Sequence, residues 1–337
     1  MNIRSIVTYL ISLGIGAVLL LLAFQKVNLS EFFTAASEVE YMWVLLSIFL
    51  SLVSHWLRAY RWNILLEPFG YHLETGRTFL AVMSGYLANL AVPRLGEVTK
   101  CGVLKKNDNV SISLSFGTVI TERVIDFLIL LFIIILGFIL QFDKIFEFFY
   151  KIIGIEQLLE NKLLLFGVAL SLTLAFIIGL LIIRNNISSN NNQGLIGKIQ
   201  SFIKELIQGL FSVRKIKNIW GFIAATIIIW VLYFFMSYVI VFSIAETSDL
   251  GMLAGLSILV AGALAMVVPV PGGVGAYHLT VSGILVIYGI ESKTGLFFAT
   301  LLHSSQFVSI LVFGGLSLLT SLFIAKKENS ISLENAN

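Results

Sequence analysis

The sequence has few charged residues, which make up 12% of its 337 positions, whereas an average soluble domain has about a quarter. Hydrophobic residues make up 58%, and the mean hydropathy is +0.96. No polar segment is long enough to form a soluble domain with its own core. This composition predicts a polytopic membrane protein. The formal net charge of +3 is too small to indicate a nucleic-acid partner.

Cysteine and the common catalytic motifs are also lacking. The single cysteine, Cys101, excludes an internal disulfide and a CxxC site. There is no phosphate-binding GxxxxGKS or GxxxxGKT loop, no HExxH and no GxSxG motif. We therefore expect no catalytic residues, no metal and no cofactor, and the sequence favours a transporter over an enzyme. An enzyme would have to rely on Glu122, Asp126 and the histidines.

Long apolar runs are the main feature that is present. Runs of spanning length cover residues 5–24, 41–66, 124–140, 163–183, 219–245 and 296–324. The first run is longer than the apolar part of a signal peptide, so it is predicted to be a retained span. Residues 29–40 and 195–217 are predicted interfacial helices, and residues 185–193 form a polar link.

Two further apolar runs lead into segments with helix-breaking residues. Residues 85–106 read GYLANLAVPRLGEVTKCGVLKK, and residues 261–278 read AGALAMVVPVPGGVGAYH. A shift of about 176 positions places Pro93 on Pro269 and Gly96 on Gly272. Paired broken segments of this kind indicate discontinuous helices around a central transporter site.

The distribution of basic residues predicts the topology. Lysine and arginine are concentrated in the link that joins the spans at 163–183 and 219–245, which places this link and both termini in the cytoplasm. Residues 78–106 then begin and end inside, and residues 251–290 begin and end outside. The predicted fold is an all-α polytopic membrane protein of about eight transmembrane helices, with two re-entrant segments in an inverted repeat.

One membrane domain is expected at residues 1–325, with repeat-like halves at 41–140 and 219–324. A short cytoplasmic tail is expected at 326–337.

Ionisable residues within apolar spans are expensive to bury and are therefore candidate functional groups. In the stretch HWLRAYRW, His55, Arg58 and Trp62 share one helical face, and Arg61 follows Arg58 by three residues. We expect both arginines to bind substrate. The alternative is that they lie at the cytoplasmic end of the span and extend into water.

A second pair of charges lies at the first break. Arg94 and Glu97 flank a proline-broken point inside an apolar segment, where a charge pair has few structural explanations. We expect them to face the ligand together with Asn89. The alternative is that Arg94 and Glu97 only neutralise one another.

The stretch TERVIDF places Glu122 and Asp126 four residues apart, on one helical face, with Arg123 beside them. If the helix begins near Ser111, Glu122 lies about three turns inside it. Glu122 is then expected to be a counter-ion for Arg94 or Arg58 and a possible proton carrier. The alternative places the acidic residues at a helix N-terminus, where the dipole favours them.

The stretch PVPGGVGAYH forms the second break. Its glycines allow close approach of the backbone to a ligand, or a hinge motion, and they are Gly272, Gly273 and Gly275. A helix that begins after such a break offers free N–H groups to an anion. His278 could titrate there, although single histidines are more often structural, and the same holds for His303.

Taken together, the motifs RAYRW, NLAVPRLGEVTKCGVLKK, TERVIDF and PVPGGVGAYH resemble the membrane region of lysylphosphatidylglycerol synthases. Flippase-like integral membrane proteins share this region. The resemblance implies a bundle of about eight helices that moves a lipid head group between leaflets. Larger relatives continue into a cytosolic aminoacyl-transferase domain. This chain ends at Asn337, so lipid aminoacylation is not expected. The chain departs from the family pattern at Tyr277 and His278, where an acidic residue often follows PGG.

The predicted function is therefore a flippase-like transporter in the cytoplasmic (inner) membrane, which moves an anionic or modified phospholipid or a lipid-linked head group. The expected substrate-binding residues are Arg58, Arg61, Asn89, Arg94, Glu97, Gly272, Gly273, Gly275 and His278. The residues expected to balance charge or couple protons are Glu122, Arg123 and Asp126. The alternatives are a membrane-embedded transferase or an accessory subunit that acts on a lipid carrier. A homo-oligomer or a partner enzyme is possible.

Overall fold

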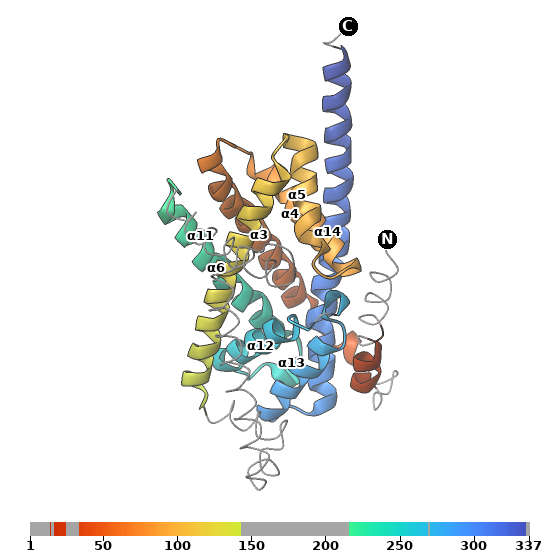
Figure 1. Cartoon of the computed structure of the whole chain (residues 1–337). Helices are drawn as coiled ribbons and strands as arrows, with labels where there is room; N and C mark the ends of the chain where they lie inside the picture. Colours follow the sequence, from red (N-terminus) through yellow and green to blue (C-terminus); the bar gives the residue numbers. More distant parts are fainter. Residues whose placement is uncertain (1–13, 15–16, 25–33, 143–215, 269, 335–337) are drawn as a thin grey trace, which may run out of the picture.

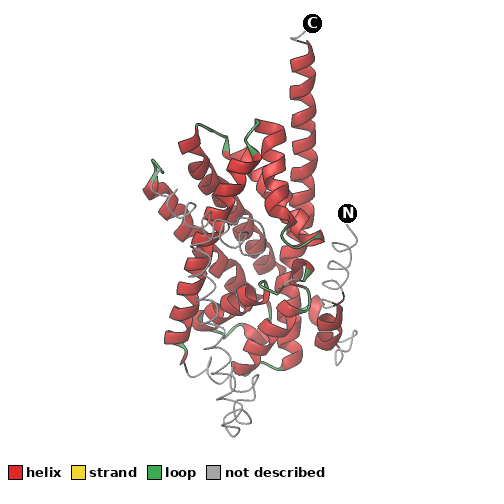
Figure 2. Cartoon of the chain, viewed as in Figure 1, coloured by secondary structure: helices red, strands yellow, loops and turns green. Residues whose placement is uncertain are grey.

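The computed structural model describes residues 14, 17–24, 34–142, 216–268 and 270–334. The predicted span at 163–183 and the polar link at 185–193 lie outside these residues. So do most of the predicted first span, residues 29–33 of the first interfacial helix and most of the second, at 195–217. Within the described part, every regular element is a helix (Figure 2).

Within the described residues, four helices are long and apolar enough to cross a membrane. They are α3 (Tyr41–Leu66), α6 (Ile112–Leu140), α11 (Ile219–Tyr238) and α14 (Ser292–Glu334). Each coincides with or contains most of a predicted span, and α3 has the predicted bounds. The apolar stretch of α11 continues as the short helix η3 (Val239–Ser243) to give a span of 25 residues. About 20 residues suffice to cross the hydrocarbon core.

The first break joins two shorter helices, α4 (Thr75–Ala91) and α5 (Leu95–Asp108), into a hairpin. Pro93 has no N–H to continue α4, and Val92 before it is extended with φ −135° and ψ 120°. Arg94 then adopts a left-handed conformation with φ 67°. The chain therefore reverses within three residues.

Two glycines allow α4 and α5 to lie close together. A Cβ atom on Gly96 would overlap the carbonyl oxygen of Gly85 and the side chain of Asn89. The backbone N–H of Gly96 donates a hydrogen bond of 2.6 Å to Asn89 Oδ1. Asn89 thus satisfies one of the free N–H groups at the start of α5.

The second break joins α12 (Met252–Ala265) to α13 (Ala276–Ile287) and contains the short helix η5 (Pro271–Gly273). It is longer than the first break, although the two sequences can be aligned, and three of its glycines have positive φ. These are Gly272 at 59°, Gly273 at 72° and Gly275 at 82°. A side chain would be strained at each of these positions.

The two hairpins enter the bundle from opposite ends, α4–α5 from the upper end in Figure 1 and α12–α13 from the lower end. Their breaks meet, because η5 packs against α4. A Cβ atom on Gly272 would lie 3.8 Å from Leu90 Cδ2. Helix α14 packs along both hairpins, against α4 and α13. The middle of the bundle is therefore built from both broken segments.

The buried apolar residues form two clusters, one around each hairpin. The first includes Trp62 and Leu104, and the second includes Ile258 and Phe298. The outward faces of α6 and α14 are also apolar, with exposed side chains such as Phe132. Exposed apolar faces of this length suit a hydrocarbon surrounding.

Candidate functional site

Two arginines of α3 are buried near one end of that helix. Arg61 has none of its surface exposed, and Arg58 has 4% exposed. The three-residue spacing places both on the side of α3 that faces α6. Neither side chain extends into water, so the alternative interpretation as snorkelling residues is wrong.

Helix α6 supplies the carboxylates that neutralise these arginines. Its N-cap is Ser111, as predicted, so Glu122 lies about three turns inside the helix. Asp126 Oδ2 lies 2.8 Å from Arg58 Nη2, and Asp126 Oδ1 lies 2.8 Å from Arg61 Nη1. Glu122 Oε1 lies 3.0 Å from Arg61 Nη2 and 3.9 Å from Arg58 Nε. The two acidic residues therefore connect both arginines in one network.

Lys100 of α5 completes the network from the first hairpin. Its Nζ atom donates a hydrogen bond of 2.8 Å to Glu122 Oε2 and lies 4.3 Å from the centre of the Trp62 ring. The Trp62 indole N–H donates to Thr118 Oγ1 at 2.9 Å. A cation over a tryptophan face gains electrostatic stabilisation in addition to its ion pair. The ion cluster thus consists of Arg58, Arg61, Lys100, Glu122 and Asp126.

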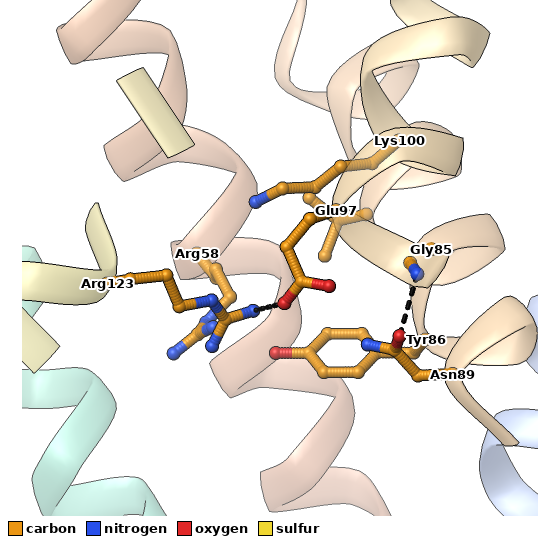
Figure 3. A pocket seen from close by; sticks show the side chains of 9 residues that line it. Arg58, Gly85, Tyr86, Asn89, Glu97, Lys100 and Arg123 are labelled. Atoms are coloured by element: carbon orange, nitrogen blue, oxygen red, sulfur yellow. Dashed lines mark hydrogen bonds and ion pairs between the residues drawn. The ribbon is translucent and has the colours of Figure 1, made fainter. Parts of the chain in front are cut away.

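A second ion pair lies at the edge of the ion cluster. Arg123 Nη2 lies 3.1 Å from Glu97 Oε1, and 43% of the Arg123 side chain is exposed (Figure 3). These two residues, with Arg58, Lys100 and Tyr86, border a small hollow of about 10 Å³. This volume is close to that of one water-sized sphere.

A much larger cavity of about 470 Å³ lies between α3, α6, α11, α12 and α14. Arg58, Tyr86 and Arg123 border both this central cavity and the small hollow. Most of the remaining wall is apolar, with residues such as Phe127 and Ile258. The volume is in the range of small-molecule sites, which are typically apolar with a few placed polar groups.

Two aromatic residues beside the second break, Tyr277 of α13 and His303 of α14, line the central cavity. His303 Nε2 lies 2.8 Å from the carbonyl oxygen of Gly272, and the Tyr277 ring stacks on the His303 ring at 4.9 Å. Both side chains line the cavity. His278 lies beside His303, with ring centres 5.1 Å apart, and its Nδ1 accepts a hydrogen bond from the Gly275 N–H at 3.3 Å.

The structure therefore brings together most, but not all, of the residues selected from the sequence. Arg58, Arg61, Glu122 and Asp126 form the ion cluster. Arg94 is exposed at the N-terminal end of α5 and is not among these ion pairs. Glu97 pairs with Arg123 rather than with Arg94. Glu122 was expected to be a counter-ion for Arg94 or Arg58. It lies 3.9 Å from Arg58, and its shorter contacts are to Arg61 and Lys100.

Lys100 is the main residue of the ion cluster that was not predicted from the sequence, although it lies within the first broken segment. The spacing of α5 contained a signal, since Gly96, Lys100, Leu104 and Asn107 recur at helical intervals and are all buried. Within the described part of the chain, no three histidine, cysteine, aspartate or glutamate residues form a group that could hold a metal ion.

These features define a class: a polytopic helical membrane protein with two helical hairpins, a buried ion cluster and an adjoining apolar cavity. The family model of the lysylphosphatidylglycerol synthase TM region matches residues 9–314. The chain therefore belongs to this lipid-related family of membrane proteins, as the motifs indicated.

Two other membrane proteins are similar to this chain. The chain is 22% identical to UPF0104 membrane protein PH1989 of Pyrococcus horikoshii over 302 residues, which cover 84% of this chain and 87% of that protein. It is 30% identical to UPF0104 membrane protein MJ1595 of Methanocaldococcus jannaschii over 93 residues, which cover 27% and 28%. No solved structure matches the chain.

Proposed function

We propose that the protein is a flippase-like transporter that moves a phospholipid, or a lipid-linked head group, with an anionic group between the leaflets of the cell membrane. The observation that carries the proposal is the position of the ion cluster at the wall of an apolar cavity of about 470 Å³. The charged wall suits a head group, and the apolar wall suits the adjoining part of the lipid. The acyl chains would remain in the bilayer.

The two broken segments support a transport mechanism. In this proposal they are re-entrant hairpins of an inverted repeat, in a protein of about eight spans with cytoplasmic termini. Transporters of this kind alternate access by moving one repeat against the other around a central site. The contact between η5 and α4 is the interface at which this motion would occur. Gly272, Gly273 and Gly275 would act as its hinge, because they adopt conformations that other residues avoid.

The geometry gives less support to an embedded transferase. Such an enzyme would need a free carboxylate above an open pocket, and the candidates were Glu122 and Asp126. Glu122 is fully buried and does not line the central cavity. Asp126 lines it but lies 2.8 Å from each of two arginines. A carboxylate held by two cations is a poor general base, because the cations favour its ionised form.

The test is leaflet exchange of fluorescent phosphatidylglycerol in vesicles that contain the purified protein. Exchange should depend on the protein and should fall at least about tenfold in Arg58→Gln, because this change removes the cation at the cavity wall. The matched control is Lys106→Gln, which removes an exposed cation of α5 and should leave exchange unchanged. If the folded wild-type protein moves no anionic, zwitterionic or neutral lipid, the proposal is wrong.

A further inference from the structure

The ion cluster does not balance its own charge. It contains three cations, from Arg58, Arg61 and Lys100, and two carboxylates, from Glu122 and Asp126. The adjacent pair of Arg123 and Glu97 is neutral overall. Buried charge without a partner is costly, so an excess of one positive charge favours a ligand with one negative charge.

Of the three cations, Arg58 has the contacts and the location to receive that ligand. The side chain of Arg61 is fully buried and does not line the central cavity, and Lys100 borders only the small hollow. Arg58 lines both. Its Nε atom is buried and makes no hydrogen bond within the described part of the chain. The guanidinium carbon lies 6.0 Å from the Tyr86 ring centre and 5.8 Å from the Tyr233 ring centre.

Two more residues of the same cavity have a buried nitrogen without a hydrogen-bond partner in the described chain. They are Trp230, at Nε1, and His55, at Nδ1. An indole N–H is a donor only, so it can be satisfied only by an acceptor atom. A buried donor that is left without an acceptor is costly. Both residues pack against the tyrosines that flank Arg58. The ring centres of His55 and Tyr86 lie 4.4 Å apart, and those of Trp230 and Tyr233 lie 5.7 Å apart.

On the basis of the proposed transport function, we infer that the central cavity selects a lipid with a monoanionic phosphodiester head group. Arg58 binds the phosphodiester, and Trp230 and His55 provide the further polar contacts. The apolar wall formed by α6 and α12 contacts the glycerol backbone and the first part of the acyl chains.

Head groups that also carry an amine fit this site less well. A zwitterionic head group would bring an ammonium group close to the three cations of the ion cluster. Of the described residues that line the central cavity, only Asp126 carries a carboxylate, and two arginines already contact it. The same argument disfavours an aminoacylated head group, which carries at least one ammonium group. The excess charge of the ion cluster therefore discriminates between lipids by electrostatic repulsion as well as by attraction.

The experiment measures binding rather than transport. Purified full-length protein in detergent is titrated with dioctanoyl phosphatidylglycerol, dioctanoyl phosphatidylcholine and glycerophosphoglycerol, which has no acyl chains, and binding is measured by isothermal titration calorimetry. We expect phosphatidylglycerol to bind at least about tenfold more tightly than phosphatidylcholine, as one charge-assisted hydrogen bond can provide. Glycerophosphoglycerol should bind more weakly than the lipid, because it cannot use the apolar wall.

Trp230→Phe is the critical variant, because it keeps an aromatic ring and removes only the donor. It should weaken phosphatidylglycerol binding by about fivefold to tenfold and leave phosphatidylcholine binding unchanged. The matched control is Trp220→Phe on the same helix, where 78% of the tryptophan is exposed and no effect is expected. Arg58→Gln should remove the preference between the two lipids.

Three results would overturn the inference: equal affinity of the wild-type protein for both lipids, unchanged phosphatidylglycerol binding in Trp230→Phe, or equally tight binding of glycerophosphoglycerol. The transport function is tested separately. Selective binding without leaflet exchange would contradict transport and leave the binding site established. Leaflet exchange with equal affinity for both lipids would contradict only the charge selection.

Discussion

Arg58 of α3 donates a hydrogen bond of 2.8 Å to Asp126 of α6, although 68 residues separate them in the chain. The contact joins two long helices next to the central cavity, and both residues line that cavity. Asp126 also lies 2.8 Å from Arg61. Loss of the Asp126 carboxylate therefore affects two arginines, whereas loss of the Arg58 cation leaves Asp126 with Arg61 as its partner.

Asp126→Asn should destabilise the protein more than Arg58→Gln. The first change raises the excess charge of the ion cluster from one to two and leaves Arg58 with Glu122 at 3.9 Å as its nearest carboxylate. The second removes the excess, and Asp126 keeps its contact with Arg61. Breaking a buried ion pair costs about 3–5 kcal/mol, and we expect Asp126→Asn to fall in this range. Thermal unfolding of both variants in the same detergent measures the order, and equal losses would contradict the charge argument.

Gly96→Ala should push apart α4 and α5, the two helices of the first hairpin. The added Cβ atom would overlap the carbonyl oxygen of Gly85 and the side chain of Asn89, so α4 and α5 could not remain at their present distance. Overpacking of this kind costs about 1–3 kcal/mol or more. Gly102→Ala in the same helix is the matched control, because no atom lies within 4 Å of its added Cβ and alanine favours helix. Thermal unfolding should show a loss in the first variant and no loss in the second.

The sequence predicted local features of the site better than its long-range pairing. The bounds of α3 follow from the length of its apolar run, and the start of α6 near Ser111 follows from the helix-compatible stretch SISLSFGTVI; both are confirmed. The common face of Glu122 and Asp126 follows from their four-residue spacing, which is a property of any helix. These features depend on neighbours in the chain.

Pairing between helices depends on packing, which the sequence does not contain in readable form. In lipid, a helix face that contacts another helix is as apolar as a face that contacts acyl chains, so the pattern does not identify the partner helix. This explains why Glu122 was expected to be a counter-ion for Arg94 or Arg58, whereas Lys100 is the cation of the first hairpin that reaches Glu122. The alignment of the two breaks also did not indicate that the second is longer, with three glycines at positive φ.

His303→Phe should loosen the second break with a small effect on overall stability. The change keeps an aromatic ring to stack on Tyr277 but removes the 2.8 Å contact with the Gly272 carbonyl oxygen. We expect a loss of about 0.5–1.5 kcal/mol in unfolding free energy. Leaflet exchange should change by more than the lost folded fraction explains, because the break lies at the contact with α4. His72→Phe, which changes a side chain that is 72% exposed, should alter neither. Unchanged exchange by folded His303→Phe would exclude this role.

Exchanging the two charges of the Arg123–Glu97 pair separates a structural role from a functional one. The pair is partly exposed, so Arg123→Glu alone should cost no more than about 1 kcal/mol of stability. The same change places a negative charge at the border of the central cavity and should reduce the exchange of phosphatidylglycerol strongly. The double variant Arg123→Glu and Glu97→Arg restores the ion pair but moves the cation to α5. If the pair only joins α5 to α6, the double variant should recover both stability and exchange. We expect recovery of stability alone, because the cation is then no longer on the α6 side of the cavity. Thermal unfolding and leaflet exchange, measured on the same preparations, distinguish these results.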